Sequence, residues 1–358
     1  MQVKKMFRLS LVMLVLGGGL ALACTVPVFR YALDHWPPDA YRLEAPVGWL
    51  ASEAGDELRK LIEEGRAQIE VHPVAEPGAP SRLVMPDIGQ EVWRGDLDGA
   101  ASSLLSSPAR AELLRRILAG ESMVWIMVRS GNESMDQKFE ERLRGRLEYL
   151  QSVAAIPEQD PTDPINKLGP GPALKVQFSL LTVSRDDPEE QVLIRMLAGP
   201  EVALLEKEAP FGAVVFGRGR VLGAWPTEDL ADEGIDEVSL FLLGACSCRV
   251  KFQNPGWDLA LAVNWDEALL GAQMEADREN EERVEAAEES ELAPQEADEP
   301  APAPELVRFG VEEGSRDKDA APSGASGTPG RMIGSLVAVV GVIALLCVFT
   351  GRADPKGS

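Results

Sequence analysis

Cysteine is the residue type in this chain best suited to covalent chemistry. Of the four cysteines, Cys246 and Cys248 are separated by one residue, and Arg249 and Lys251 follow closely. Nearby cations stabilise a thiolate, and a disulfide across so short a loop is strained and easily reduced. The pair therefore fits a structural disulfide, two buried thiols or a redox-active site. A metal site is disfavoured because both histidines, His35 and His72, lie far away in the sequence.

Cys24 has three interpretations. It directly follows Ala21-Leu22-Ala23, which places small residues at positions −3 and −1 of a cleavage site. A cysteine there resembles the lipoprotein box of bacteria, in which the thiol carries a lipid, although Leu22 departs from that pattern. Cys24 is therefore a lipidation candidate, an N-terminal residue without a role, or a reactive thiol in a Cys-x-x-Pro sequence. Cys347 lies in an apolar run and is interpreted as a small apolar residue.

Two apolar segments predict export and anchoring. Basic residues precede the apolar run 9–23, which is typical of a signal peptide over residues 1–23. Cleavage, lipidation and an uncleaved anchor remain alternatives there. The uncharged run 332–349 would span about 27 Å as a helix, which matches a bilayer core. We therefore expect a transmembrane helix over 332–350, a cytoplasmic tail over 351–358, and the bulk of the chain on the extracytoplasmic side of the cell membrane.

The charge of the chain is strongly negative and unevenly distributed. The formal net charge is −23, and residues 273–306 contain 13 acidic and 2 basic side chains. Such acidity argues against a nucleic-acid partner and against docking on anionic lipid. Residues 269–331 have few large apolar side chains, which predicts a disordered acidic and Pro/Gly/Ser-rich linker. An acidic binding tail is the alternative.

Residues 122–268 contain a regular succession of strands and helices. The apolar patterns predict the order β-α-β-α-β-β-α, with Gly217-Arg218-Gly219 as a hairpin turn. The expected elements are strands 123–129, 174–183, 211–216 and 220–225 and helices 134–153, 188–197 and 235–243.

This order resembles the thioredoxin fold, and Pro210 stands where that family has a cis-proline, just before the third strand. The resemblance implies a mixed sheet with helices on both faces. It also implies a reactive cysteine in the loop after the first strand, yet residues 130–135 contain none. Ser134 is expected to cap the following helix instead.

Residues 24–121 repeat the pattern in weaker form, with Trp at each hairpin end and Asp-Leu before each last helix. This predicts a duplication: an α/β chain of two tandem thioredoxin-like repeats, over 24–121 and 122–268. The first repeat has no obvious opening strand, and Cys24 precedes its first helix. A strand over 259–265 is expected to pair with the first sheet or to extend an edge. The elements expected in the first repeat are helices 28–36, 56–64 and 109–118 and strands 41–45, 68–71, 82–85 and 91–94.

A second resemblance covers the start of the mature chain. The sequence from Cys24 to Leu33, Cys-Thr-Val-Pro-Val-Phe-Arg-Tyr-Ala-Leu, is similar to the N-termini of exported bacterial proteins of unassigned function. No phosphate-binding loop or nucleophile elbow is present, so no cofactor or metal is expected. The sequence favours a membrane-anchored envelope protein that binds a protein partner and is not an enzyme. A thiol-disulfide oxidoreductase or redox sensor using Cys246 and Cys248, with Cys24, and an accessory subunit of a membrane complex are the alternatives.

Overall fold

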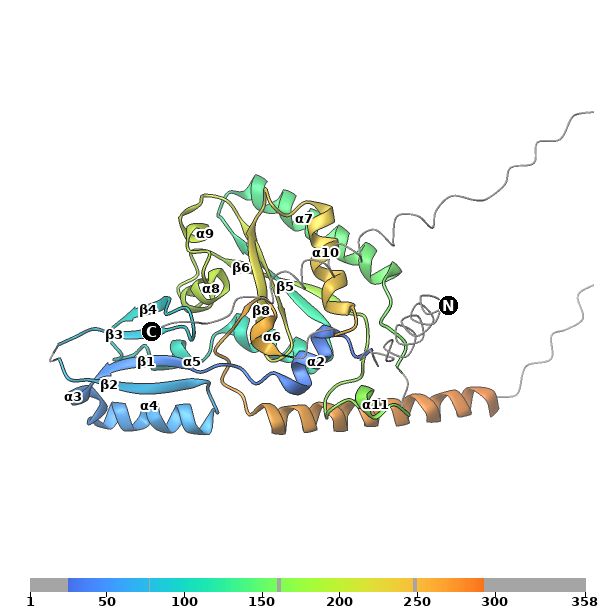
Figure 1. Cartoon of the computed structure of the whole chain (residues 1–358), viewed down its shortest axis with the longest axis horizontal. Helices are drawn as coiled ribbons and strands as arrows, with labels where there is room; N and C mark the ends of the chain where they lie inside the picture. Colours follow the sequence, from blue (N-terminus) through green and yellow to red (C-terminus); the bar gives the residue numbers. More distant parts are fainter. Residues whose placement is uncertain (1–24, 77, 160–161, 247–249, 293–358) are drawn as a thin grey trace, which may run out of the picture. The chain divides into compact units, whose positions relative to one another are not determined.

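A four-stranded mixed sheet forms the first half of the fold. A computed structural model of the chain describes residues 25–76, 78–159, 162–246 and 250–292. β1 lies inside this sheet, parallel to β2 and antiparallel to β3, in the order β2-β1-β3-β4 (Figure 1). The predicted strand 41–45 is thus confirmed as β1, and it is the opening strand that the sequence analysis expected to be missing. The strands are β1 (Tyr41–Pro46), β2 (Ile69–Val74), β3 (Ser81–Val84) and β4 (Glu91–Gly95).

The second sheet has five strands in the order β6-β5-β7-β8-β9. β5 is parallel to β6 and antiparallel to β7, and β8 continues the antiparallel half. The first four strands of this sheet therefore have the same order and directions as those of the first sheet. The protein is a mixed α/β fold with two mixed sheets and flanking helices. The strands are β5 (Met123–Arg129), β6 (Phe178–Ser184), β7 (Phe211–Phe216), β8 (Arg220–Pro226) and β9 (Trp257–Asp258).

Helices cover both faces of the second sheet. On one face an apolar cluster combines α7, α10 and α2 with inward-facing strand residues such as Trp125 and Phe216. The backbone N–H of Val28 at the start of α2 donates to Gly244 O at the end of α10, at 3.0 Å. Helix α2, which the sequence analysis grouped with the first repeat, therefore packs on the second sheet. The helices are α2 (Val28–His35), α7 (Glu133–Val153), α8 (Gln191–Ala198), α9 (Ala203–Glu206) and α10 (Asp232–Leu243).

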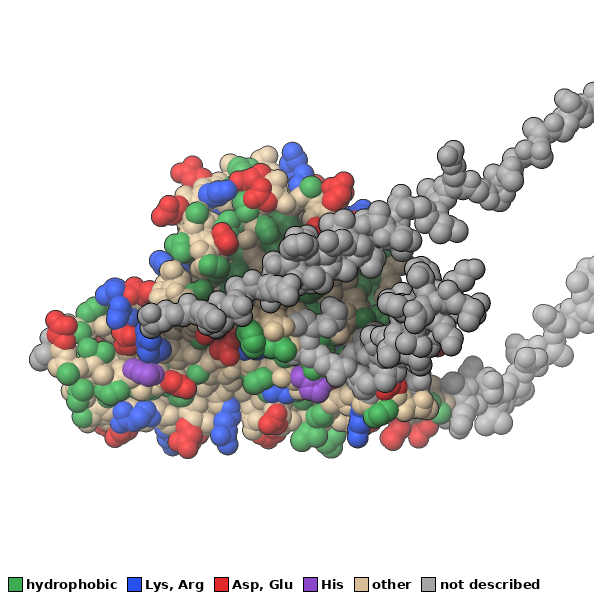
Figure 2. All heavy atoms as spheres, viewed as in Figure 1, with side chains coloured by type: hydrophobic (Ala, Val, Ile, Leu, Met, Phe, Trp, Pro, Cys, Tyr) green, Lys and Arg blue, Asp and Glu red, His purple; other side chains and the backbone are tan. Residues whose placement is uncertain are grey.

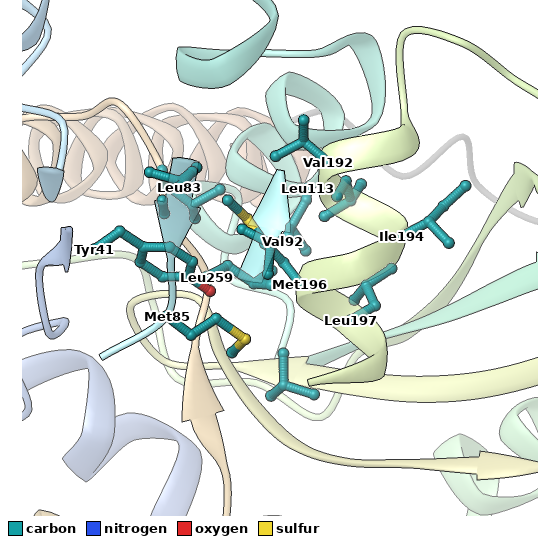
Figure 3. Close-up of a cluster of buried hydrophobic side chains, with 14 of the residues drawn as sticks. Tyr41, Leu83, Met85, Val92, Leu113, Val192, Ile194, Met196, Leu197 and Leu259 are labelled. Carbon is teal, nitrogen blue, oxygen red and sulfur yellow. The ribbon is translucent and has the colours of Figure 1, made fainter. Parts of the chain in front are cut away.

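The two sheets share one apolar cluster. Helix α8 contacts β4 of the first sheet and β8 of the second, and α6 contacts β5 and β6. Figure 3 shows side chains of the first sheet, such as Tyr41 and Leu83, beside those of α8, such as Met196. The described residues accordingly belong to one compact unit. The remaining helices of this part are α3 (Val47–Leu50), α4 (Glu53–Glu64), α5 (Ala101–Leu105) and α6 (Pro108–Leu118).

Helix α11 (Trp265–Leu292) corrects the prediction of disorder from residue 269. Its first turns are anchored in the core by the buried side chains of Trp265 and Leu269. Residues 270–286 are mostly exposed and rich in Ala and Glu, which are good helix formers, and Arg278 bonds to Glu282 one turn later at 2.7 Å. Acidic and basic side chains are interspersed over the face seen in Figure 2. The predicted linker beyond residue 292 lies outside the described residues.

Two further groups of predictions concern the strand 259–265 and the segments at the two ends of the chain. The predicted strand 259–265 is absent; instead β9 adds a short edge to the second sheet, and an isolated bridge joins Ala67 to Ala262. Within the described residues, no helix is long and apolar enough to cross a membrane. The predicted signal peptide 1–23, transmembrane helix 332–350 and tail 351–358 lie outside those residues.

Candidate functional site

The loop after β5 is where the thioredoxin resemblance places a reactive thiol. Residues 130–132 of this loop fold over the buried carboxylate of Asp136. Its Oδ1 accepts from Ser130 N at 2.8 Å and Ser130 Oγ at 2.9 Å, and its Oδ2 accepts from Gly131 N at 3.0 Å. Asn132 is the N-cap of α7, accepting from Met135 N at 3.2 Å, so the predicted cap at Ser134 is wrong. A fixed carboxylate therefore takes the N–H groups that could otherwise stabilise a thiolate.

Pro210 lies at the start of β7, as expected, and its neighbourhood is also occupied by protein groups. The Ala209–Pro210 peptide bond is trans, in contrast to the cis bond of thioredoxins. The Arg185 guanidinium donates to Ala209 O at 2.8 Å and to Lys207 O at 2.8 Å, and it lies over the Phe211 ring. Burial lowers the pKa of Arg185, against an opposing effect of Asp136. Arg185 therefore fixes the segment before β7.

The corresponding loop of the first sheet, between β1 and α4, also lacks cysteine. It contains the short helix α3, and Ser52 caps α4 by accepting from Gly55 N at 3.3 Å. Trp49 Nε1 donates to Asp98 at 2.8 Å. Because β1 is the opening strand, this is the loop of the first sheet in which the thioredoxin resemblance would place a reactive thiol. This loop, and not the segment before α2 that contains Cys24, therefore corresponds to the thiol-bearing loop of the resemblance.

Of the cysteines that the sequence analysis singled out, only Cys246 lies within the described residues. It follows α10 and is 3 % exposed, inside the apolar cluster that contains α2 and α7. Its backbone N–H donates to Val26 O at 2.9 Å. This environment differs from the exposed, electropositive surroundings that activate a thiol. Cys24 and Cys248 lie outside the described residues.

The N-terminal stretch around Arg30 forms helix α2 and contributes to the apolar core. Val28, Phe29, Ala32 and Leu33 are buried, which explains the apolar residues of that stretch. The Arg30 and Asp34 side chains are 3 % and 2 % exposed and form an ion pair one helical turn apart.

Arg30 also holds the loop 169–172. Its Nη1 donates to Pro172 O at 2.6 Å, and its Nη2 donates to Gly169 O at 2.6 Å. Asp34 Oδ2 accepts from Gly169 N at 2.9 Å. The residues that carry the resemblance to other N-termini therefore have a packing role in this structure.

A partly buried ion cluster, which the sequence analysis did not find, joins the connector before β1 to the second sheet. Asp258 on β9 accepts from Arg220 on β8 at 3.0 Å, and it also bonds to Lys251. Lys251 Nζ reaches Asp39 Oδ2 at 2.7 Å and donates to Pro37 O at 2.6 Å.

The balance of charge in this cluster indicates a structural role. Burial raises the pKa of Asp258, and the nearby Lys251 and Arg220 oppose that effect. The remaining Arg220 donors reach carbonyls of the adjoining turn, including Gly256 O at 2.9 Å. The cluster borders a cavity of about 330 Å³. The cluster has no local sequence pattern, because its members come from the segment before β1, from β8 and from residues 251–258.

No arrangement of at least three metal-ligating side chains occurs among the described residues. No protein-family model matches the chain. A search of curated proteins finds no significant match either. The site must therefore be interpreted from its own chemistry.

Proposed function

We propose that this chain is a membrane-anchored envelope protein in which two thioredoxin-like repeats, without redox activity, form a binding or assembly module. The shared strand order of the two sheets, β2-β1-β3-β4 and β6-β5-β7-β8, supports the thioredoxin-like interpretation. Pro80 and Pro210 each stand one residue before the third strand of their sheet, which supports a duplication. In this proposal the signal peptide exports the chain and the helix over 332–350 holds it in the membrane.

The occupied loop after β5 is the observation that carries the proposal. A thioredoxin-type reaction needs a thiolate at the N-terminus of the first helix. Here the side chain of Asp136 fills that position from within the fold, and the equivalent loop of the first sheet contains Ser52 and no cysteine. A fold that keeps its scaffold and lacks the reacting group is suited to binding.

The redox alternative would depend on Cys246 and Cys248. The burial of Cys246 among apolar side chains argues against it, because such surroundings raise the pKa of a thiol and shield it from substrate. No observation favours the accessory-subunit alternative over a general binding role.

A disulfide-reduction assay tests the proposal. The full chain in detergent micelles is compared with the Cys246→Ser/Cys248→Ser variant for dithiothreitol-driven reduction of insulin. We expect the two proteins to show the same background rate. A rate for the unaltered chain several times that of the variant would favour the redox alternative.

A second experiment tests the binding role. Chemical cross-linking of the full chain in the intact envelope should yield a heteromeric product, and its absence would contradict the binding role.

A further inference from the structure

A groove lies between helix α10 and strand β8 of the second sheet. Leu222 and Trp225 of β8 form its base, and Val238 and Phe241 of α10 form its helical wall. The cavity measures about 480 Å³, and apart from Gly234 and two acidic residues its lining side chains are apolar. Phe241 is 39 % exposed at the rim. A concave apolar surface that is open to solvent is suited to burying an apolar part of a partner.

The base of the groove is held in place by its neighbours. The Trp225 indole lies over Gly223, where a Cβ would come within 2.5 Å of the ring. The same ring packs against the fully buried Trp125, with ring centroids 6.1 Å apart. A preformed apolar surface of this kind loses little conformational entropy when a partner binds.

The backbone of β8 is closed to a partner strand. Gly223, Ala224 and Pro226 are buried, and the turn at Gly256 lies against the first half of the strand. Pro226 has no N–H, and its carbonyl accepts from Asp229 N at 3.1 Å. A partner in the groove must therefore contact side chains and satisfy its own N–H and C=O groups. An α-helix does so, because its backbone hydrogen bonds are internal.

Negative charge borders the groove. Residues 226–241 contain six acidic side chains and no Lys, Arg or His. Asp229 and Glu237 line the groove itself, and neither forms an ion pair with another described residue. A second copy of this chain, with its net charge of −23, would bring further negative charge to this surface. The charge therefore favours a different partner that carries cationic side chains.

We propose that this groove binds an amphipathic, cationic α-helix of a partner protein. Apolar side chains one turn apart on that helix pack over Trp225 and against Phe241. Lys or Arg side chains beside its apolar stripe pair with Asp229 and Glu237. This inference rests on the proposed binding function and specifies the secondary structure and the charge of the partner.

Fluorescence anisotropy of a labelled peptide tests the proposal directly. The probe is a 16-residue peptide of Ala and Lys with two Leu residues four positions apart, titrated with the full chain in phosphatidylcholine nanodiscs. Empty nanodiscs give the background, and we expect binding above it. Phe241→Asp should weaken binding about tenfold, because a charge replaces the apolar contact. Glu237→Lys should weaken it about threefold to tenfold, and less so at high salt.

Two matched variants serve as controls. Leu240→Asp places the same charge on the same helix at a residue that is 50 % exposed and does not line the groove. Glu57→Lys makes the same charge reversal on α4. Both should bind the peptide within about twofold of the unaltered chain. Thermal unfolding of each variant checks the fold, and if Phe241→Asp unfolds at a lower temperature, the exposed Glu237→Lys decides.

A second peptide tests whether the bound partner is a helix. Replacing the Ala midway between the two Leu residues with Pro breaks the helix and leaves both Leu side chains in place. We expect this peptide to bind no more than the background. Equal binding of the two peptides would overturn the helical mode. Binding of the first peptide no higher than background, or unchanged binding by Glu237→Lys, would overturn the groove as the site.

A photo-cross-linking amino acid in the full chain distinguishes this inference from the broader function. Placed at position 241 in the intact envelope, it should join a partner segment with apolar residues at helical spacing beside Lys or Arg, whereas at position 240 it should not. If lysine-directed cross-linking captures a partner but position 241 does not, the groove is refuted and the binding function remains. If neither method captures a partner, both are refuted.

Discussion

Replacing Arg30 with Met is expected to destabilise the protein severely. The change removes one member of an ion pair whose side chains are 3 % and 2 % exposed. It also removes the donors to Pro172 O and Gly169 O, leaving Asp34 as a buried charge without its cation. Breaking a buried pair in this way costs about 3–5 kcal/mol of unfolding free energy. At about 2–4 °C per kcal/mol for a fold of this size, the melting temperature should fall by about 6–20 °C.

The assay is thermal unfolding of the full chain in detergent micelles, followed by circular dichroism. Arg59→Met is the control, because Arg59 pairs with Asp56 on the surface, with side chains 42 % and 74 % exposed. It should change stability by less than about 0.5 kcal/mol. Adding Asp34→Leu to Arg30→Met should recover about 1–2 kcal/mol, because the unpaired charge is removed. The reasoning is refuted if Arg30→Met matches the control, or if the double variant is less stable than the single one.

Three further changes test other parts of the fold by the same unfolding measurement. Gly256→Ala should lower the free energy of unfolding by at least about 3 kcal/mol, because φ is +106° and the Cβ would clash with a β8 carbonyl. Gly271→Ala, in open space on α11, should leave that free energy unchanged or raise it. Equal effects of the two changes would contradict this reasoning. Burial raises the pKa of Glu44, but hydrogen bonds from Arg82 and a second arginine lower it by more, below the usual 4.5. The stability from Glu44 is therefore present above pH 4.5 and lost below it, so Glu44→Gln should destabilise at neutral pH and not in acid; a cost independent of pH would refute this. Cys246→Ser should lower the free energy of unfolding by about 1–3 kcal/mol, more than Cys246→Ala does, because it buries a hydroxyl. Native Cys246 should resist alkylation, and rapid alkylation would contradict its burial.

Most elements could be predicted from local sequence patterns. The continuous apolar run 123–129 predicted β5 correctly, and the two-strand pattern around Gly217 and Gly219 predicted the hairpin of β7 and β8. These signals are local, because strand length and turn chemistry are determined by neighbouring residues. Helix α11 was missed because its Ala and Glu content is compatible with both an exposed helix and a disordered segment. The buried Trp265 at its start decides between them, and burial depends on the tertiary fold.

The site depended on contacts that no local pattern contains. Asp136 could be placed in a helix from the sequence, but its role in binding the loop amides required the position of residues 130–131. Apart from Lys251, the partners of Asp258 come from β8 and from the segment before β1, so the ion cluster had no sequence signature. The role of β1 was misassigned because the preceding helix α2 looked like part of the same repeat.

The position of α2 has a consequence for how the chain folds. Along the chain, the strands of the first sheet come between this helix and the second sheet, which the helix covers. The hydrogen bond from Tyr41 to Asp258 likewise joins residues that are 217 positions apart. A chain synthesised from its N-terminus would present the apolar face of α2 long before α10 emerged to bury it. Because these contacts join residues far apart in the sequence, the packing of α2 on the second sheet is expected to be a late and slow step. Cutting the chain between the two sheets should therefore leave the C-terminal fragment, which holds every strand of the second sheet, without the helix α2 that covers it.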